Sequence, residues 1–152
     1  MRLILLLIAP ALVQAQQVAI PPPDQDPFVG KWKANARKSR PKLDRKEASY
    51  ERTIGRDGED LVFASSGGVS RAAIRQFRIR CDGLFHPLPT GPILSCMYVG
   101  ANRVEGETKT PVKTDLFWSR EVSADGLELT ISEYKDRART KLRSVTVLDR
   151  IK

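Results

Sequence analysis

Short runs of alternating apolar and polar residues dominate the chain from Phe28 onward. A period of two residues is typical of β-strands, in which successive side chains point to opposite faces. The i, i+3, i+4 spacing of amphipathic helices is almost absent. The pattern predicts strands at Phe28–Ala34, Ser49–Ile54, Asp60–Ser65, Ala72–Cys81, Leu84–Pro87, Ile93–Val99, Arg103–Thr108, Thr114–Val122, Leu127–Tyr134 and Leu142–Ile151.

Three Asp-Gly pairs lie between predicted strands, at Asp57-Gly58, Asp82-Gly83 and Asp125-Gly126. Asp-Gly is a strong hairpin signal because both central residues of a type I′ turn need a positive φ. The sequence therefore predicts three hairpins, which join the second strand to the third, the fourth to the fifth and the eighth to the ninth. The one helical candidate, Asn35–Glu47, contains Pro41 and lacks an apolar stripe, so a single helical turn is the most that fits there.

About ten sequential strands in one small domain predict an all-β fold, an antiparallel up-and-down β-barrel of about eight to ten strands. Closure of the sheet removes exposed edges, which otherwise invite aggregation. The alternation predicts an apolar inner face with three sets of neighbours: Leu61, Phe63 and Ser65; Phe77, Ile79 and Cys81; and Leu127, Leu129 and Ile131.

The N-terminus has the pattern of an export signal. A basic residue, Arg2, precedes the apolar run Leu3–Val13, and Ala15 is a small residue at the expected cleavage site. The apolar run has 11 residues, well short of the roughly 20 that span a bilayer, so we expect no transmembrane segment. The sequence thus divides into a signal peptide at 1–15, a Pro-rich extended lead-in at 16–27 and a barrel domain at 28–152. We expect the product to be periplasmic or secreted.

The composition is that of an ordinary globular protein, with 41% hydrophobic and 7% aromatic residues. The full chain has 26 basic and 18 acidic residues, and removal of Arg2 with the signal leaves 25 against 18, a net charge of +7. His86 is the single histidine, and Cys81 and Cys96 are the two cysteines. So few ligands make a zinc site or a His-based active site improbable, and we expect no cofactor.

The two cysteines are 15 residues apart. In an oxidising compartment they can form a disulfide, and a loop of this size would stabilise the fold by roughly 3 kcal/mol. Two buried free thiols are the alternative, because cysteine also packs well as a small hydrophobic residue.

The opening strand contains Gly30-Lys31-Trp32, and the last strand ends in Val147-Leu148-Asp149-Arg150. These segments resemble the first and last strands of the calycin superfamily, which includes lipocalins and fatty-acid-binding proteins. The resemblance implies that Trp32 lies under the barrel floor and that Arg150 packs across it. Asn35-Ala36-Arg37-Lys38-Ser39 resembles an Asn-x-x-Lys-Ser segment of exported bacterial lipocalin-like proteins. The likeness extends from Phe28 to Lys152 and implies no particular activity.

Two features depart from these families. Fatty-acid-binding proteins hold a carboxylate with an inward Arg and Tyr, two residues apart on the last strand, and the matching positions here are Thr146 and Leu148. The usual lipocalin disulfide ties the C-terminal segment to the barrel, which Cys81 and Cys96 cannot reproduce. The resemblance therefore implies a fold without identifying a ligand.

A barrel of this size is wide enough to hold one small molecule. The sequence predicts an exported binding protein, not an enzyme, with a small apolar ligand. The candidate ligand-binding residues are Phe63, Phe77, Phe117 and Leu148. The alternative is a packed barrel whose aromatic residues are plain core.

The segment Lys31–Lys46 is strongly basic, with eight Lys or Arg residues and only Asp44 as an acidic residue. It predicts a second possible function, in which the basic surface binds anionic envelope polymers or lipids. We do not expect nucleic acid as a partner, because the protein is exported and Trp32 is the only aromatic residue in the segment. A solvated basic face without a partner is the alternative. His86 has no nucleophile at a recognisable spacing, and the Asp residues lie mostly at turns, so catalysis is not expected.

Overall fold

A computed structural model describes residues 20–67, 76–89, 91–111 and 115–152. The predicted signal peptide at 1–15 lies outside these residues. The strands are β1 (Gly30–Ala34), β2 (Glu51–Asp57), β3 (Asp60–Ser66), β4 (Gln76–Arg80), β5 (Asp82–Pro87), β6 (Ile93–Gly100), β7 (Arg103–Lys109), β8 (Leu116–Val122), β9 (Glu128–Tyr134) and β10 (Leu142–Ile151). A short 3-10 helix, η1 (Glu47–Ser49), precedes β2.

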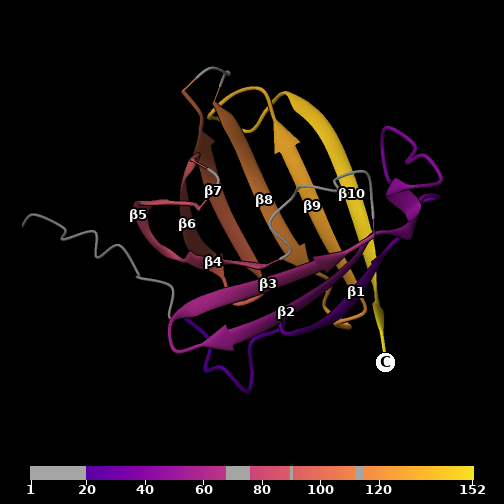
Figure 1. The fold of residues 1–152 in the computed structure, drawn as a ribbon, viewed down its shortest axis with the longest axis horizontal. Helices are drawn as coiled ribbons and strands as arrows, with labels where there is room; N and C mark the ends of the chain where they lie inside the picture. Colours follow the sequence, from indigo (N-terminus) through magenta and orange to yellow (C-terminus); the bar gives the residue numbers. More distant parts are fainter. Residues whose placement is uncertain (1–19, 68–75, 90, 112–114) are drawn as a thin grey trace, which may run out of the picture.

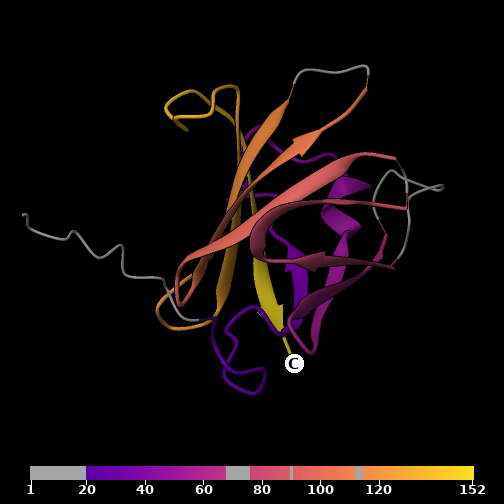
Figure 2. The same ribbon diagram turned by 90° about the vertical axis from the view of Figure 1, so that its left-hand side faces the viewer.

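All ten strands belong to one antiparallel sheet with the order β4-β3-β2-β1-β10-β9-β8-β7-β6-β5. Apart from β4 and β5, strands that follow each other in the chain pair with each other, and β1 pairs with β10, so the sheet curls into a nearly closed barrel with β4 and β5 at its two edges. Figure 1 shows β2 and β3 crossing the direction of β8 and β9. The view in Figure 2 shows these two groups of strands on opposite sides of the barrel. The predicted all-β, up-and-down barrel is confirmed.

Two of the three predicted hairpins are confirmed. Asp57 and Asp60 face each other across the β2–β3 turn, and Asp125 accepts a hydrogen bond from the backbone N–H of Leu127 in the β8–β9 turn. The hairpin predicted at Asp82-Gly83 is wrong. β4 pairs with β3, β5 pairs with β6, and the two strands lie at opposite ends of the sheet order. The positive φ of Gly83 (83°) instead occurs where the β5–β6 register shifts.

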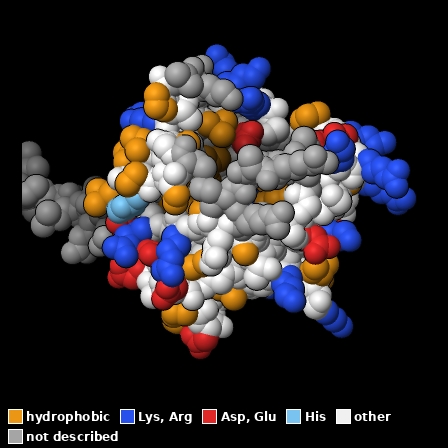
Figure 3. Space-filling model, viewed as in Figure 1, with side chains coloured by type: hydrophobic (Ala, Val, Ile, Leu, Met, Phe, Trp, Pro, Cys, Tyr) orange, Lys and Arg blue, Asp and Glu red, His pale blue; other side chains and the backbone are white. Residues whose placement is uncertain are grey.

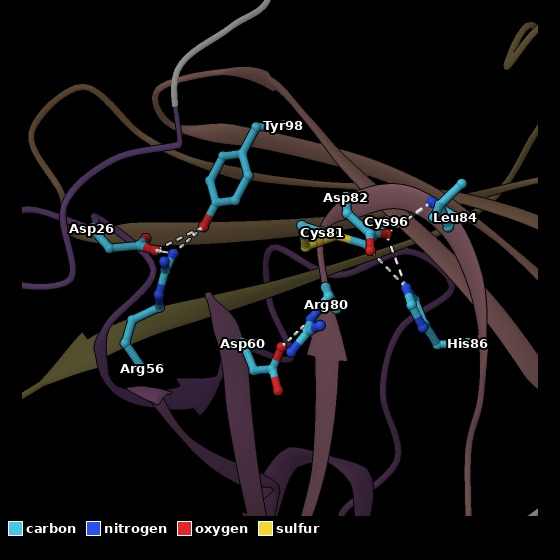
Figure 4. The surroundings of a disulfide bond; sticks show 10 residues. All are labelled: Asp26, Arg56, Asp60, Arg80, Cys81, Asp82, Leu84, His86, Cys96 and Tyr98. Carbon is cyan, nitrogen blue, oxygen red and sulfur yellow. Dashed lines mark hydrogen bonds and ion pairs between the residues drawn. A yellow bond between two sulfur atoms is a disulfide. The ribbon is translucent and has the colours of Figure 1, made fainter. Parts of the chain in front are cut away.

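The junction between β4 and β5 is fixed by a disulfide between Cys81 and Cys96. Cys81 lies between the two edge strands, and Cys96 lies on β6 (Figure 4). Cys81 is held in the core beside β6, the strand that pairs with β5. The predicted disulfide is confirmed, and it links the β4–β5 junction covalently to β6.

The interior is filled by the alternate residues of each strand, as the pattern predicts. The buried core consists of Phe28, Trp32, Ile54, Leu61, Phe63, Ile79, Cys81, Leu94, Cys96, Tyr98, Val104, Trp118, Val122, Leu129 and Leu148. Leu127, which the sequence placed on the inner face, is 57% exposed because it precedes β9 in the turn. At Gly106, a Cβ atom would lie 2.2 Å from the ring of Trp118, so only glycine lets this indole cross β7.

One end of the barrel is sealed by side chains. The indole of Trp32 is fully buried and donates a hydrogen bond to the carbonyl of Phe28. The guanidinium of Arg150 lies 4.1 Å from the centre of the Trp32 ring and donates hydrogen bonds to the carbonyls of Pro27, Val29 and Gly126. The two residues that the resemblance assigned to the floor are therefore in direct contact. We call this end of the barrel the floor.

The lead-in contributes a second group to the floor. Asp26 is completely buried, and its carboxylate accepts hydrogen bonds from Arg56 (2.7 Å), from the Tyr98 hydroxyl (2.7 Å) and from the N–H of Phe28 (3.0 Å). Figure 4 shows the three side chains pointing toward one another. Burial and Asp26 raise the pKa of Tyr98 above its ordinary value, although Arg56 opposes the shift. Every charge at the floor thus has a partner.

Candidate functional site

Two arginines extend into the barrel from different strands, β2 and β8. Arg52 lies on β2, two residues before the buried Ile54, and Arg120 lies on β8 between the buried Trp118 and Val122. Because side chains two residues apart in a strand share a face, both arginines point inward. Both guanidinium groups also contact the ring of Phe63, which is a core residue.

Arg120 is the less satisfied of the two. Its guanidinium carbon lies 4.7 Å from the ring centres of both Phe63 and Trp118. Its Nε is buried, and no hydrogen-bond acceptor among the described residues reaches it. Burial, followed by repulsion from Arg52, lowers the pKa of Arg120 to about 9. The side chain is still a cation at neutral pH, and it is held in an aromatic environment.

Arg52 has more interaction partners than Arg120. Its guanidinium carbon lies 5.0 Å from the centre of the Tyr50 ring, and its Nε donates a weak hydrogen bond to the hydroxyl of Ser65 at 3.4 Å. The Tyr50 hydroxyl is 3.2 Å from the same Ser65 oxygen. The Phe77 ring, stacked on Phe63 with 4.9 Å between centres, completes the surroundings. Burial lowers the pKa of Arg52, and Tyr50 partly offsets this shift.

One carboxylate faces the same space. Glu133 on β9 is directly opposite the inward Trp118 and accepts a hydrogen bond of 2.9 Å from Ser144 on β10. It attracts Arg120, but no salt bridge joins the two among the residues that the structure describes. With two cations and one anion among the residues that the structure describes, the cluster has a net charge of +1, so it could accept a further single negative charge.

This end of the barrel is more accessible than the floor. Inward side chains here, such as Tyr50, Phe77, Ile131 and Glu133, are only half-buried, whereas Trp32 at the floor is fully buried. The start of β2, the end of β3 and the start of β10 meet at this end. We call it the mouth, and the two arginines lie on the mouth side of the core.

The four predicted ligand-binding residues separate into two groups. Phe63, Phe77 and Leu148 are inside the barrel, and the first two contact the arginines. Phe117 adjoins the inward Trp118 on β8 and therefore faces the opposite side, where the guanidinium of Arg137 lies 5.8 Å from its ring. The structure thus brings three of the four together and places the fourth against the loop between β9 and β10.

Arg52 and Arg120 are not among the site residues predicted from the sequence. A signal was available, because each arginine is in phase with the apolar residues of its strand: Arg52 with Ile54, and Arg120 with Trp118 and Val122. The last strand lacks the Arg and Tyr with which fatty-acid-binding proteins hold a carboxylate. Thr146 and Leu148 do face inward, but the cations at this site come from β2 and β8 instead.

An open groove of about 170 Å³ crosses the strands β1, β2 and β3. Its lining includes Lys31, Thr53 and Ala64, which alternate with the inward residues Trp32, Ile54 and Phe63. The groove therefore lies on the outer face of the sheet. Most of its lining is polar or charged, and we do not assign an apolar ligand to it.

His86 has an acidic partner. Its Nε2 is 2.9 Å from both carboxylate oxygens of Asp82, which also accepts a hydrogen bond from the N–H of Leu84 (Figure 4). These hydrogen bonds lower the pKa of Asp82 despite some burial. Among the described residues, no group of His, Cys, Asp and Glu has the arrangement of a metal site. Within the same residues, no helix is long and apolar enough to cross a membrane.

No protein-family model matches the sequence, and no curated protein matches it significantly. Similarity is found at the level of structure. A fatty-acid-binding protein of Schistosoma mansoni in complex with arachidonic acid is 11% identical with a TM-score of 0.57, and the match covers 84% of this chain and 98% of that protein. The fatty acid transporter REP1-NXSQ is 14% identical with a TM-score of 0.56, with 82% and 96% covered.

A third similar structure is the fatty-acid-binding protein from Drosophila melanogaster brain, at 14% identity and a TM-score of 0.53, with 80% of this chain and 98% of that chain covered. At such low identities the similarity concerns the fold alone. The order of the strands, the β1–β10 closure and these matches together show that the chain has the calycin fold of the fatty-acid-binding proteins.

Proposed function

We propose that this protein is a non-catalytic carrier of a small amphipathic anion. The apolar part of the ligand lies in the barrel against Phe63 and Phe77, and its negatively charged head lies beside Arg120 and Arg52. The observation that carries this proposal is the buried Nε of Arg120, which has no acceptor among the described residues.

Burial of an unpaired cation is expensive, and proteins normally pair such a group with an acid or with several acceptors. The aromatic rings of Phe63 and Trp118 attract the cation through their faces, but they offer no acceptor in the plane of the guanidinium. A carboxylate can accept those N–H bonds in a bidentate manner. A bound anion would therefore satisfy a buried side-chain donor for which the described residues supply no acceptor.

The similar structures support the apolar part of the proposal. The three similar solved structures are of fatty-acid-binding or fatty-acid-transport proteins, one of them in complex with arachidonic acid. Their barrels and this one share the strand arrangement, while the anchor expected on the last strand is replaced here by Thr146 and Leu148. We infer that the ligand head is held by β2 and β8 in this protein.

The proposed carrier is exported, as the signal pattern at 1–15 predicts. In this respect it would be similar to the exported lipocalin-like proteins that the segment Asn35–Ser39 resembles. The Cys81–Cys96 disulfide supports this location, because such bonds persist mainly in oxidising compartments. Localisation of a tagged full-length chain, compared with one that lacks residues 1–15, tests the export; equal retention in the cytoplasm would contradict it.

Binding of oleate and oleyl alcohol, measured by isothermal titration calorimetry, tests the proposed ligand. The two molecules share their apolar chain and differ in the charge of the head. We expect the protein to prefer oleate by at least about tenfold, since a charge-assisted hydrogen bond contributes about 1.5 to 3 kcal/mol. In Arg120→Met this preference should disappear while the alcohol still binds.

Arg78→Met is the matched control. Arg78 is an exposed arginine on β4 that pairs with Asp57 and alternates with the inward Phe77, so its loss removes the same charge from the outer face of the sheet. It should keep the preference for oleate. Equal affinity of the unmodified protein for the two molecules, or an equal loss in both variants, would show that Arg120 does not hold an anionic head.

A further inference from the structure

The loop between β1 and β2 crosses one side of the mouth. At one end, Arg40 forms an antiparallel bridge with Val145 of β10. At the other end, η1 lies against the end of β3, where a Cβ atom on Gly67 would be 2.3 Å from the carbonyl oxygen of Ser49. The loop leads directly into Tyr50, which contacts Arg52 in the candidate site. It therefore forms part of the rim of the mouth.

This loop has several cations without acidic partners. Arg40, Lys42, Arg45 and Lys46 are exposed, and none of them forms a salt bridge with a described residue. Lys33 and Lys38, in the same basic segment, do form salt bridges, with Glu51 in one case and with Glu128 and Asp149 in the other. The positive charge left over in Lys31–Lys46 is thus concentrated at the rim.

The two acidic residues of the loop are engaged locally. The carboxylate of Asp44 accepts a hydrogen bond from the N–H of Glu47, and the carboxylate of Glu47 accepts one from the N–H of Asp44. These reciprocal bonds fix the loop before η1. The loop has two acids against six cations, which are Arg37, Lys38, Arg40, Lys42, Arg45 and Lys46. The net charge is therefore positive, and the acids are directed toward the backbone.

The start of β10 adds to this surface. Because the Arg40–Val145 bridge is antiparallel, residues 41–46 and residues 144–141 leave it toward the same end of the barrel. Arg143 is exposed and forms no salt bridge with a described residue, and its neighbour Leu142 is 53% exposed. Figure 3 shows Lys and Arg side chains gathered at the edge of the molecule where Figure 1 places this loop.

We propose that this surface, which consists of Arg40, Lys42, Arg45, Lys46, Leu142 and Arg143 and which we call the basic rim, docks on an anionic lipid bilayer. Each Lys or Arg near such a surface contributes favourably, and an exposed leucine between cations can enter the boundary between headgroups and acyl chains. No aromatic residue belongs to the basic rim, which disfavours stacking on nucleic acid bases. The docked orientation would turn the mouth toward the bilayer.

Sedimentation with vesicles tests this surface. The full-length protein is mixed with vesicles of phosphatidylcholine and phosphatidylglycerol in equal parts, and pure phosphatidylcholine measures binding that does not depend on lipid charge. We expect strong preference for the mixed vesicles, and a loss of about tenfold or more in the variant Lys42→Glu/Arg143→Glu. This docking needs no bound fatty acid, so it can fail while the proposed carrier function holds.

The matched control is Lys31→Glu/Lys152→Glu, which changes the net charge equally. Lys31 lies on β1 opposite Ile151, next to Lys152 in the chain and away from Val145. This variant should bind the mixed vesicles within about twofold of the unmodified protein. An equal loss in both variants would mean that only the total charge matters, and it would overturn the basic rim as a docking surface.

Leu142→Ser separates a bilayer from a soluble anionic polymer. We expect this variant to bind the mixed vesicles several-fold more weakly and to bind dextran sulfate unchanged, because only the bilayer offers an apolar phase to Leu142. If both ligands bind this variant as they bind the unmodified protein, the surface recognises anionic charge of any kind, and the lipid assignment is wrong.

Discussion

The floor and the mouth of this barrel both contain arginines directed into the protein, but the two ends differ in the hydrogen-bond acceptors that they supply to these arginines. At the floor, Arg150 donates hydrogen bonds to three carbonyls, and Arg56 is paired with the buried carboxylate of Asp26. At the mouth, Arg120 and Arg52 repel each other and lie among aromatic rings. The residue type is the same, so its role follows from whether the fold supplies acceptors.

This difference separates stability from binding. A cation whose three nitrogens each donate to a backbone carbonyl holds segments together, as Arg150 does for residues 27, 29 and 126. A buried cation with a free donor costs stability, and a protein that retains it has a use for the donor. We therefore expect substitutions at the floor to unfold the protein and substitutions at the mouth to change what it binds.

The largest effect should come from Trp32→Ala. The indole is fully buried, donates to the carbonyl of Phe28 and supports the guanidinium of Arg150. Its removal leaves a large cavity at the floor, and we expect a loss of about 3 to 5 kcal/mol in the free energy of unfolding, measured with urea. A loss below about 1 kcal/mol would contradict the role of Trp32 in sealing the floor.

Asp26→Ala should destabilise the protein by about 3 kcal/mol, because Arg56, whose side chain is only 5% exposed, would lose its acidic partner. The double variant Asp26→Ala/Arg56→Met removes the stranded charge and should regain part of this loss. Urea unfolding of the two variants gives the comparison. If the double variant were less stable than the single one, the Asp26–Arg56 pair would not explain the effect.

Removal of the disulfide in Cys81→Ser/Cys96→Ser should cost about 3 kcal/mol, since the bond closes a loop of 15 residues. The bond joins the β4–β5 junction to β6, so hydrogen exchange should increase in β4 and β5 more than in β9 and β10. Uniform exchange along all strands would indicate that the bond stabilises the fold without fixing this junction.

Arg120→Met should have the opposite sign and stabilise the ligand-free protein by about 1 to 3 kcal/mol. In the folded state burial lowers the pKa of Arg120 to about 9, well below the ordinary value of an arginine, so the charged form opposes folding below pH 9. That penalty falls as the pH rises above about 9, because the folded protein then releases the proton before the unfolded chain does. Thermal unfolding at pH 7 measures the gain, and a destabilised variant would show that Arg120 is satisfied after all.

Much of the fold could be predicted from local patterns. The period of two residues located all ten strands, and Leu142–Ile151 was predicted with the observed bounds. The error at Asp82-Gly83 has a physical cause. A positive φ is needed both in a hairpin turn and in a bulge, so the dipeptide alone does not distinguish them. The pairing of β5 with β6 instead of β4, which is visible only in the folded structure, distinguishes the two.

The site was less predictable because it depends on contacts across the barrel. Phe63 and Phe77 could be selected as apolar inward residues, but their value as a site comes from Arg52 and Arg120, which lie 68 positions apart in the chain. Similarly, Asp26 belonged to a segment that was expected only to lead into the barrel, and its burial depends on Arg56 and Tyr98. Alternation locates the inward face, whereas pairing of charges requires the folded structure.

The smallest expected effect sharpens the comparison at the mouth. The affinity for oleate should be constant from pH 8 to about 9 and then fall by up to about tenfold per pH unit, because the ligand-free protein loses the Arg120 charge as the pH rises through its lowered pKa of about 9. Oleyl alcohol should show no such decline. Oleate binding to the Arg120→Met variant should not decline either, because its affinity is already low.

Calorimetric titrations from pH 8 to pH 10.5 measure the profile. If both ligands weakened together above pH 9, the cause would be a general loosening of the barrel at alkaline pH, because Tyr98, whose pKa is raised by burial and by Asp26, contributes stability that is lost only above about pH 10. A decline confined to oleate would place the effect at the mouth, on the arginine whose donor the fold leaves free.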